Sequence, residues 1–135
     1  LINEENVKVL VDLKYSNPGW THHQLTFAYD STSITPSVEH GLQLLIDHGV
    51  RRENIQFFVL LGYDETFEQE KARCDLLWKR WKVLPFCMLY NNTKDSQRRS
   101  LARYFNKRVQ KVCEFKDYFE ARKHAPNHAE SLDQW

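Results

Sequence analysis

Acidic residues follow two apolar segments of this chain, where ligand-binding residues commonly lie in α/β proteins. Asp30 follows a short alternating segment. Gly62 follows the almost continuously apolar segment 55–61, and Asp64 and Glu65 come next. A strand that runs into a glycine-containing loop and a capped helix builds ligand sites at the carboxyl edges of parallel sheets and barrels. Carboxylates there can accept hydrogen bonds from ribose hydroxyl groups, which makes this edge the candidate site.

Each of these residues also has a purely structural interpretation. Asp30 can cap the Ser-Thr-Ser turn that follows it. Asp64 and Glu65 precede a predicted helix, where the helix dipole favours negative side chains without any further function. A glycine at position 62 is expected from backbone geometry under either interpretation. The residue types alone therefore leave the function of this edge open.

Strand-like and helix-like segments alternate along the chain. The expected strands cover residues 24–30, 55–61 and 83–90, and helices are expected over 3–14, between 35 and 49, from a capping box at Thr66 and Gln69, from Asp95, and around Phe115. Strands separated by helices of this length run parallel through right-handed crossovers, so we expect an α/β fold with three parallel strands. The central segment is apolar almost throughout, which is typical of strands covered on both faces.

The composition indicates one domain without a strong charge bias. We expect a single domain over residues 1–125 and a polar, poorly ordered tail at 126–135. Lys and Arg number 19 against 18 Asp and Glu, so the excess of positive charge typical of nucleic-acid binders is missing and nucleic acid is not an expected partner. Six basic residues follow Asp95, and we expect them to form a solvated face. They are Arg98, Arg99, Arg103, Lys107, Arg108 and Lys111.

The cysteines do not show the spacing of a metal site or a disulfide framework, and the histidines are expected in surface or loop positions. Cys74 and Cys87 fall on apolar stripes and are expected to be small core residues, with Cys113 unpaired. His22 and His23 are adjacent, and His40 and His48 are eight residues apart, too far for the i, i+4 pairing of helical metal ligands. No apolar run is long enough for a membrane helix, so we expect a cytoplasmic protein in a reducing compartment.

Four segments of the chain resemble the C-terminal half of the radical S-adenosylmethionine enzymes. They are residues 25–30, 38–50, 57–68 and 84–91, and the likeness extends to 101–108 and 112–118, so that it covers about residues 1–120. Those enzymes fold as a partial (β/α)6 barrel. The resemblance therefore implies an α/β three-stranded parallel half-barrel, the C-terminal part of a partial TIM barrel, with helices packed on one face.

The resemblance also implies roles for residues of the central strand. The family's Gly-x-Ile-x-Gly-x-x-Glu motif falls on Phe58, Leu60, Gly62 and Glu65. Phe58 departs from the glycine of that motif, and Leu60 replaces the isoleucine. By this correspondence Leu60 packs on the adenine of the cofactor, and Gly62 lets the turn approach it closely.

The remaining cofactor positions fall at the ends of the other two strands. The ribose-contacting position corresponds to Asp30, and the adenine-facing end of the last strand lies near Met88 and Tyr90. The expected cofactor-binding residues are therefore Asp30, Leu60, Gly62, Glu65, Met88 and Tyr90. No catalytic or metal-binding residue is expected in this chain.

The family's Cys-x-x-x-Cys-x-x-Cys motif, which holds a [4Fe-4S] cluster, does not occur in these residues. The cluster and S-adenosylmethionine belong to the full-length parent. This chain is expected to hold no cluster and to bind the cofactor weakly or undetectably by itself. The resemblance thus predicts a C-terminal fragment of a radical SAM-like protein. It would contribute part of the nucleoside pocket, be inactive alone, and need the missing N-terminal half-barrel as its partner.

Two other functions remain open. Three parallel strands leave sheet edges unpaired, so the chain can instead be a non-catalytic interaction module that self-associates through its open barrel edge. A small α/β enzyme that binds phosphate at the helix start near Thr66 is the other alternative.

Overall fold

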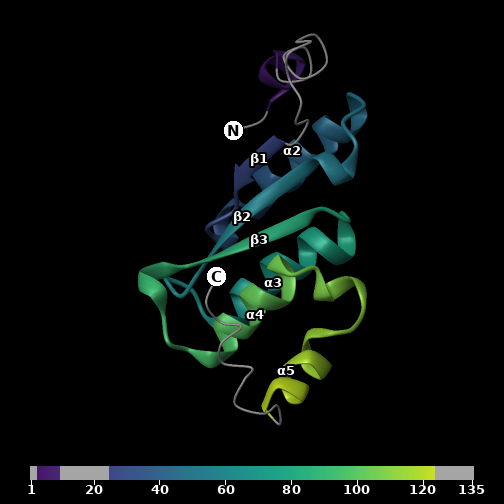
Figure 1. Ribbon diagram of the computed structural model, residues 1–135. Helices are drawn as coiled ribbons and strands as arrows, with labels where there is room; N and C mark the ends of the chain where they lie inside the picture. Colours follow the sequence, from purple (N-terminus) through teal and green to yellow (C-terminus); the bar gives the residue numbers. More distant parts are fainter. Residues whose placement is uncertain (1–2, 10–24, 124–135) are drawn as a thin grey trace, which may run out of the picture.

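The computed structural model describes residues 3–9 and 25–123, which form a three-stranded sheet with helices beside it (Figure 1). In chain order the elements are β1 (Leu25–Ala28), α2 (Thr35–Asp47), β2 (Ile55–Leu61), α3 (Phe67–Asp75), β3 (Leu84–Leu89), α4 (Ser96–Asn106) and α5 (Phe115–Lys123). A helical segment at residues 4–9 precedes them. The tail at 126–135, the rest of the expected first helix, His22 and His23 lie outside the described residues.

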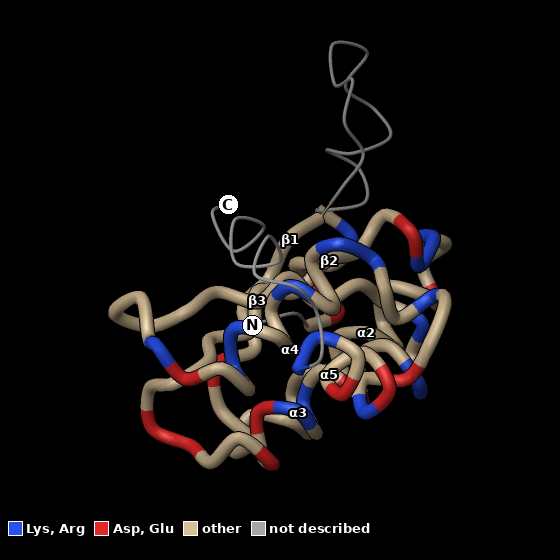
Figure 2. Tube along the Cα trace, turned by 60° about the horizontal axis from the view of Figure 1, so that its bottom comes forward, with Lys and Arg blue, Asp and Glu red and all other residues tan. Residues whose placement is uncertain are grey.

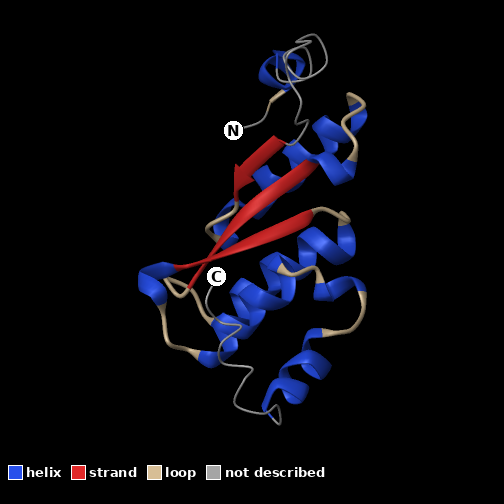
Figure 3. Ribbon diagram, in the orientation of Figure 1, coloured by secondary structure: helices blue, strands red, loops and turns tan. Residues whose placement is uncertain are grey.

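The sheet has the order β1-β2-β3, and both strand pairs are parallel (Figure 3). Phe27 is the register partner of Phe57, and Leu60 is the partner of Met88. The α/β class and the three parallel strands that the sequence predicts are confirmed. Because all three strands point the same way, their carboxyl ends meet at one edge of the sheet.

Side chains alternate between two very different sides of the sheet. One side packs against α2, α3 and α4, which lie together beside the strands (Figure 2). Its residues belong to the buried core, and they include Leu25, Ile55, Phe57, Val59, Leu61 and Cys87. On the other side Phe58 and Met88 are 39% and 48% exposed, and Leu60 is half-buried. We call these two surfaces the covered side and the open side.

The prediction that the central strand is covered on both faces is wrong. Its apolar run IQFFVLL does alternate in burial over its second half, where Phe58 is exposed and Val59 is buried. Phe58 is therefore apolar without being enclosed, whereas Gln56 in the first half of the strand is polar and buried.

Two local signals at the helix ends are confirmed, whereas Thr35 does not cap α2, which begins at Thr35 itself. Thr66 and Gln69 form a reciprocal capping box, in which the Thr66 hydroxyl accepts from the Gln69 N–H at 3.2 Å and the Gln69 carboxamide accepts from the Thr66 N–H at 2.9 Å. Gly49 ends α2 with a φ of +87°, a conformation that glycine adopts without strain.

The basic run after Asp95 is not a solvated face throughout. Arg103 is buried, and Arg98 is largely covered and makes ion pairs with Glu70 and Asp95. Only part of the run, such as Lys107 and Lys111, is exposed. Acidic and basic positions are mixed along the helices rather than gathered on one side (Figure 2).

Cys74 and Cys87 lie in the core as predicted, with their Sγ atoms 3.6 Å apart. Burial raises the pKa of the Cys74 thiol well above its ordinary value, so this thiol stays protonated and unreactive. Among the described residues, the helices are too short or too polar to cross a membrane.

Candidate functional site

Four apolar side chains form a surface on the open side of the sheet, near its carboxyl end. Phe58 and Phe86 are register partners whose rings meet edge to face at 5.8 Å, and Leu60 and Met88 are the next pair along the same two strands. We call these four residues the open platform. The two residues that the resemblance assigns to adenine, Leu60 and Met88, are therefore neighbours on an accessible surface.

Two exposed tyrosines lie just beyond the open platform. Tyr63 follows β2 and Tyr90 follows β3, and their rings meet edge to face with centroids 4.8 Å apart. Tyr90 is one of the predicted site residues, whereas Tyr63 was not predicted. Its position directly after Gly62 is the only signal in the sequence that points to it, because a contact between two loops leaves no local pattern.

Gly62 has a left-handed backbone conformation that glycine adopts without strain. Its φ is +87°, and a Cβ at this position would stand 3.4 Å from the Cδ of Arg98. The Gly62 N–H donates a hydrogen bond of 2.7 Å to Oε2 of Glu70. The turn after β2 is therefore held by a carboxylate that comes from α3.

Glu70 and Arg98 form what we call the inner clamp. The Glu70 carboxylate is 1% exposed, and its Oε1 accepts from Nε of Arg98 at 2.7 Å. Arg98 also donates to Asp95 at 2.8 Å and to the backbone oxygen of Glu65 at 3.1 Å. The hydrogen bond with Glu70 raises the pKa of Arg98, which keeps the guanidinium charged. The inner clamp thus ties the loop after β2 to the start of α4.

Glu65 belongs to a second cluster, the outer clamp, together with Thr32 and Arg73. Its Oε2 accepts from the Thr32 N–H at 2.8 Å, and its Oε1 accepts from the Thr32 hydroxyl at 2.9 Å. Nε of Arg73 lies 3.0 Å from Oε1. Burial alone would raise the pKa of Glu65, but the Thr32 hydrogen bonds and the Arg73 charge outweigh burial and lower it. A cofactor contact of Glu65 stays a prediction, because its two oxygens already join the loops after β1 and β2.

Asp30 is exposed at the carboxyl end of β1. The turn after it is capped by Ser31, whose hydroxyl accepts from the Ser33 N–H at 3.2 Å. The structural interpretation of Asp30 as the cap of this turn is therefore wrong. Within the described residues, its carboxylate makes no hydrogen bond. One strand separates β1 from β3, which places Asp30 about 10 Å from the strand that carries Met88.

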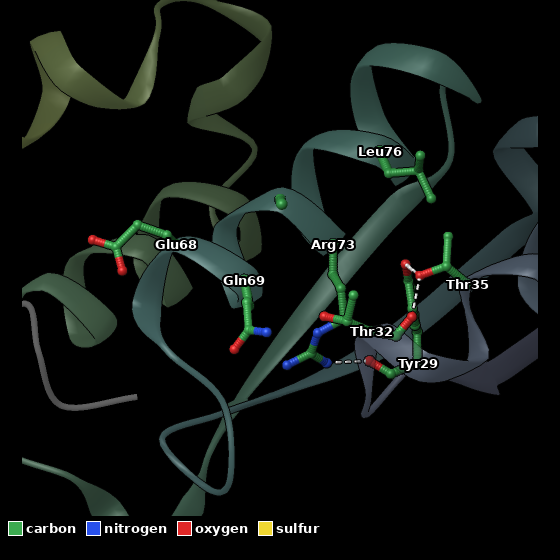
Figure 4. Close-up of a pocket in the computed structure, with 8 residues that line it drawn as sticks. Tyr29, Thr32, Thr35, Glu68, Gln69, Arg73 and Leu76 are labelled. Carbon is green, nitrogen blue, oxygen red and sulfur yellow. Dashed lines mark hydrogen bonds between the residues drawn. The ribbon is translucent and has the colours of Figure 1, made fainter.

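A cavity of about 370 Å³ lies on the covered side, between the start of α2 and α3 (Figure 4). It is lined by Tyr29, Thr32, Thr35, Glu68, Gln69, Ala72, Arg73 and Leu76. None of the six predicted site residues lines it. Arg73, its most deeply buried charged group, is occupied by the backbone oxygens of Tyr29 and Leu60 and by Glu65. The cavity therefore belongs to the packing of the two clamped loops.

At the start of α3, the capping box takes the N–H groups of Thr66 and Gln69. Phosphate binding at this helix start stays a prediction. In the part of the chain that the structure describes, His, Cys, Asp and Glu do not form a group of three that could hold a metal ion.

The chain has no match among protein-family models, curated proteins or solved structures. The candidate site is therefore defined by its residues and their geometry.

Proposed function

We propose that the chain is the C-terminal half of a radical SAM-type protein and supplies part of the pocket for the nucleoside of S-adenosylmethionine. One observation supports this most directly. Leu60 and Met88, which the resemblance assigns to adenine, are register partners on the open side of the sheet, at the edge where Gly62 turns the chain.

The chemistry of the open platform suits a flat heteroaromatic ring. Leu60 and Met88 offer apolar contact, and the thioether of a methionine packs favourably against aromatic rings. Tyr90 adds an aromatic edge beside them, held by Tyr63. Asp30 offers an acceptor for ribose hydroxyl groups at the first strand. Together these groups bind and orient a nucleoside, and the chain itself supplies no reacting group.

The parent protein would hold the [4Fe-4S] cluster in its other half. That cluster supplies the electron that cleaves the sulfonium of S-adenosylmethionine. The residues of this chain would shape the wall of the pocket opposite the cluster and exclude water from it. The proposed partner is therefore the N-terminal half-barrel, and the chain alone is inactive.

The single methionine of the chain allows a sharp test, because Met88 is the only residue of its type. A methyl-labelled sample has one methionine signal, and it should shift when S-adenosylhomocysteine is added at millimolar concentration. The expected affinity is weak, since half of the pocket is missing. Met88→Leu removes the signal, so the matched controls are Leu60→Asp, which should abolish the shift, and Val112→Ser, far more exposed and outside the platform, which should not.

The decisive measurement uses the complete, cluster-loaded parent. It should bind S-adenosylmethionine, and Leu60→Asp should weaken this binding at least tenfold with the cluster content unchanged. A complete parent that does not bind the cofactor, or that binds it equally well with Leu60→Asp, would contradict the proposed function.

A further inference from the structure

The outer edge of β1 is open in the described structure. The Tyr29 N–H donates to the Phe58 oxygen at 2.8 Å, so the odd-numbered residues of this strand face β2. Thr26 and Ala28 therefore direct their backbone N–H and C=O groups away from the sheet. Both residues are exposed, and no described segment pairs with them.

The outer edge of β3 is largely closed by contrast. Pro85, Cys87 and Leu89 are the residues whose backbone faces outward on this strand, and Pro85 has no N–H to offer. Asn106, the last residue of α4, covers Cys87 with its carboxamide. Its Oδ1 accepts from the Cys87 N–H at 2.8 Å, and its Nδ2 donates to the Cys87 oxygen at 2.9 Å. This side chain replaces a neighbouring strand.

The sequence of β1 has none of the usual protection of an edge strand. Sheets commonly block their edges with charged residues or proline, whereas Leu25–Ala28 reads LTFA. The formal net charge of the chain is only +1, so two copies repel one another little. An unprotected edge on a nearly neutral molecule favours pairing with an identical edge.

We propose that two copies of this chain pair through their β1 edges, antiparallel, about a two-fold axis at Phe27. In this register Thr26 of each copy lies opposite Ala28 of the other. Each of these two pairs forms two backbone hydrogen bonds, which makes four in all. The result is one six-stranded sheet. Because Pro85 and Asn106 block most of the β3 edge, each copy pairs through β1 alone, and the assembly stops at a dimer instead of growing into a fibre. The inference does not depend on the nucleoside, since a chain that binds no cofactor can still pair in this way.

The interface is small, and its affinity should be modest. A standard interface buries about 800 Å² on each partner, and a four-residue edge strand supplies only part of that area. We therefore expect a dissociation constant on the order of 10–100 μM. Light scattering with size separation should give a monomer at about 1 μM and a dimer near 500 μM.

Amide hydrogen exchange identifies the surface that pairs. The amides of Thr26 and Ala28 should exchange more slowly at high concentration, while the amides of Phe27 and Tyr29, already paired within the sheet, should not change. A monomer at every concentration overturns the proposal. So does a dimer in which the Thr26 and Ala28 amides stay unprotected, because it would use another surface such as the open platform.

Proline at position 28 tests the same edge by mutation. Ala28→Pro removes only an outward N–H, so the pairing with β2 is kept, and the variant should remain monomeric near 500 μM. Ala28→Ser keeps the N–H and is the matched control that should still dimerise. If Ala28→Pro does not fold, as judged by circular dichroism, Thr26→Lys places a charge within the paired edge without altering the backbone. Dimerisation of a folded Ala28→Pro or Thr26→Lys variant overturns the proposal.

Discussion

The two sides of the sheet have similar amino-acid types and different physical roles. Val59 and Leu61 are completely buried against the helices. Phe58, on the same strand but on the open side, is 39% exposed. The covered side therefore carries the hydrophobic stabilisation of the domain. The open side carries partly exposed apolar area, which is typical of a surface that meets another molecule. The following predictions test this division.

The largest effect on stability is expected at the inner clamp, which ties the loop after β2 to the start of α4. Arg98→Met leaves the buried Glu70 carboxylate without its charged partner. Breaking a buried ion pair in this way costs about 3–5 kcal/mol, and chemical denaturation should show a loss of that size. The control is Arg80→Met, since Arg80 is 67% exposed in its pair with Glu39 and should cost less than about 1 kcal/mol. Equal losses of stability in the two variants would show that the buried ion pair contributes no more than the exposed one.

Adjacent leucines give the sharpest comparison of the two sides. Leu61→Ala empties a completely buried position and should cost about 3 kcal/mol. Leu60→Ala removes the same atoms from a half-buried position on the open side and should cost about 1 kcal/mol. The unfolding midpoints of the two variants measure the difference. Similar losses would mean that the open side contributes to the core after all.

Asn106→Ala should have a smaller effect on stability. It removes two hydrogen bonds to the Cys87 backbone, and about 1–2 kcal/mol should be lost. The amide of Cys87 should then exchange faster, while the amides that face β2 remain protected. An unchanged exchange rate at Cys87 would show that this edge is covered in another way.

The smallest effect is expected at the outer clamp and depends on pH. The pKa of Glu65 is lower in the folded chain than its ordinary value of 4.5, so its contribution is complete above that pH and is lost as the pH falls through the folded pKa. Denaturation at a series of pH values should show Glu65→Gln to be less stable than the unaltered chain at pH 7, with the gap closing as the pH falls below 4.5. A gap that persists at low pH would assign the loss to packing instead of charge.

Local patterns could predict the elements but not the contacts between them. The three strands, their parallel order and the capping box at Thr66 follow from apolar runs, crossover geometry and residue spacing. The exposure of Phe58 could not be predicted, because a continuous apolar run does not reveal which of its residues lack a cover. The burial of Arg98 with Glu70, and the Tyr63 and Tyr90 contact, join segments far apart in the chain. Only the resemblance pointed to Leu60 and Met88 as a pair, and spacing alone could not have done so.

Asn106 links the integrity of a helix end to the way that copies of the chain assemble. It occupies the final position of α4, where helices fray most readily, and yet its side chain seals β3. In a molecule whose last turn of α4 has unwound, the outer edge of β3 would be exposed as well as the outer edge of β1. Heat or mild denaturant would then raise the population of species that can polymerise without limit, well before the domain melts as a whole.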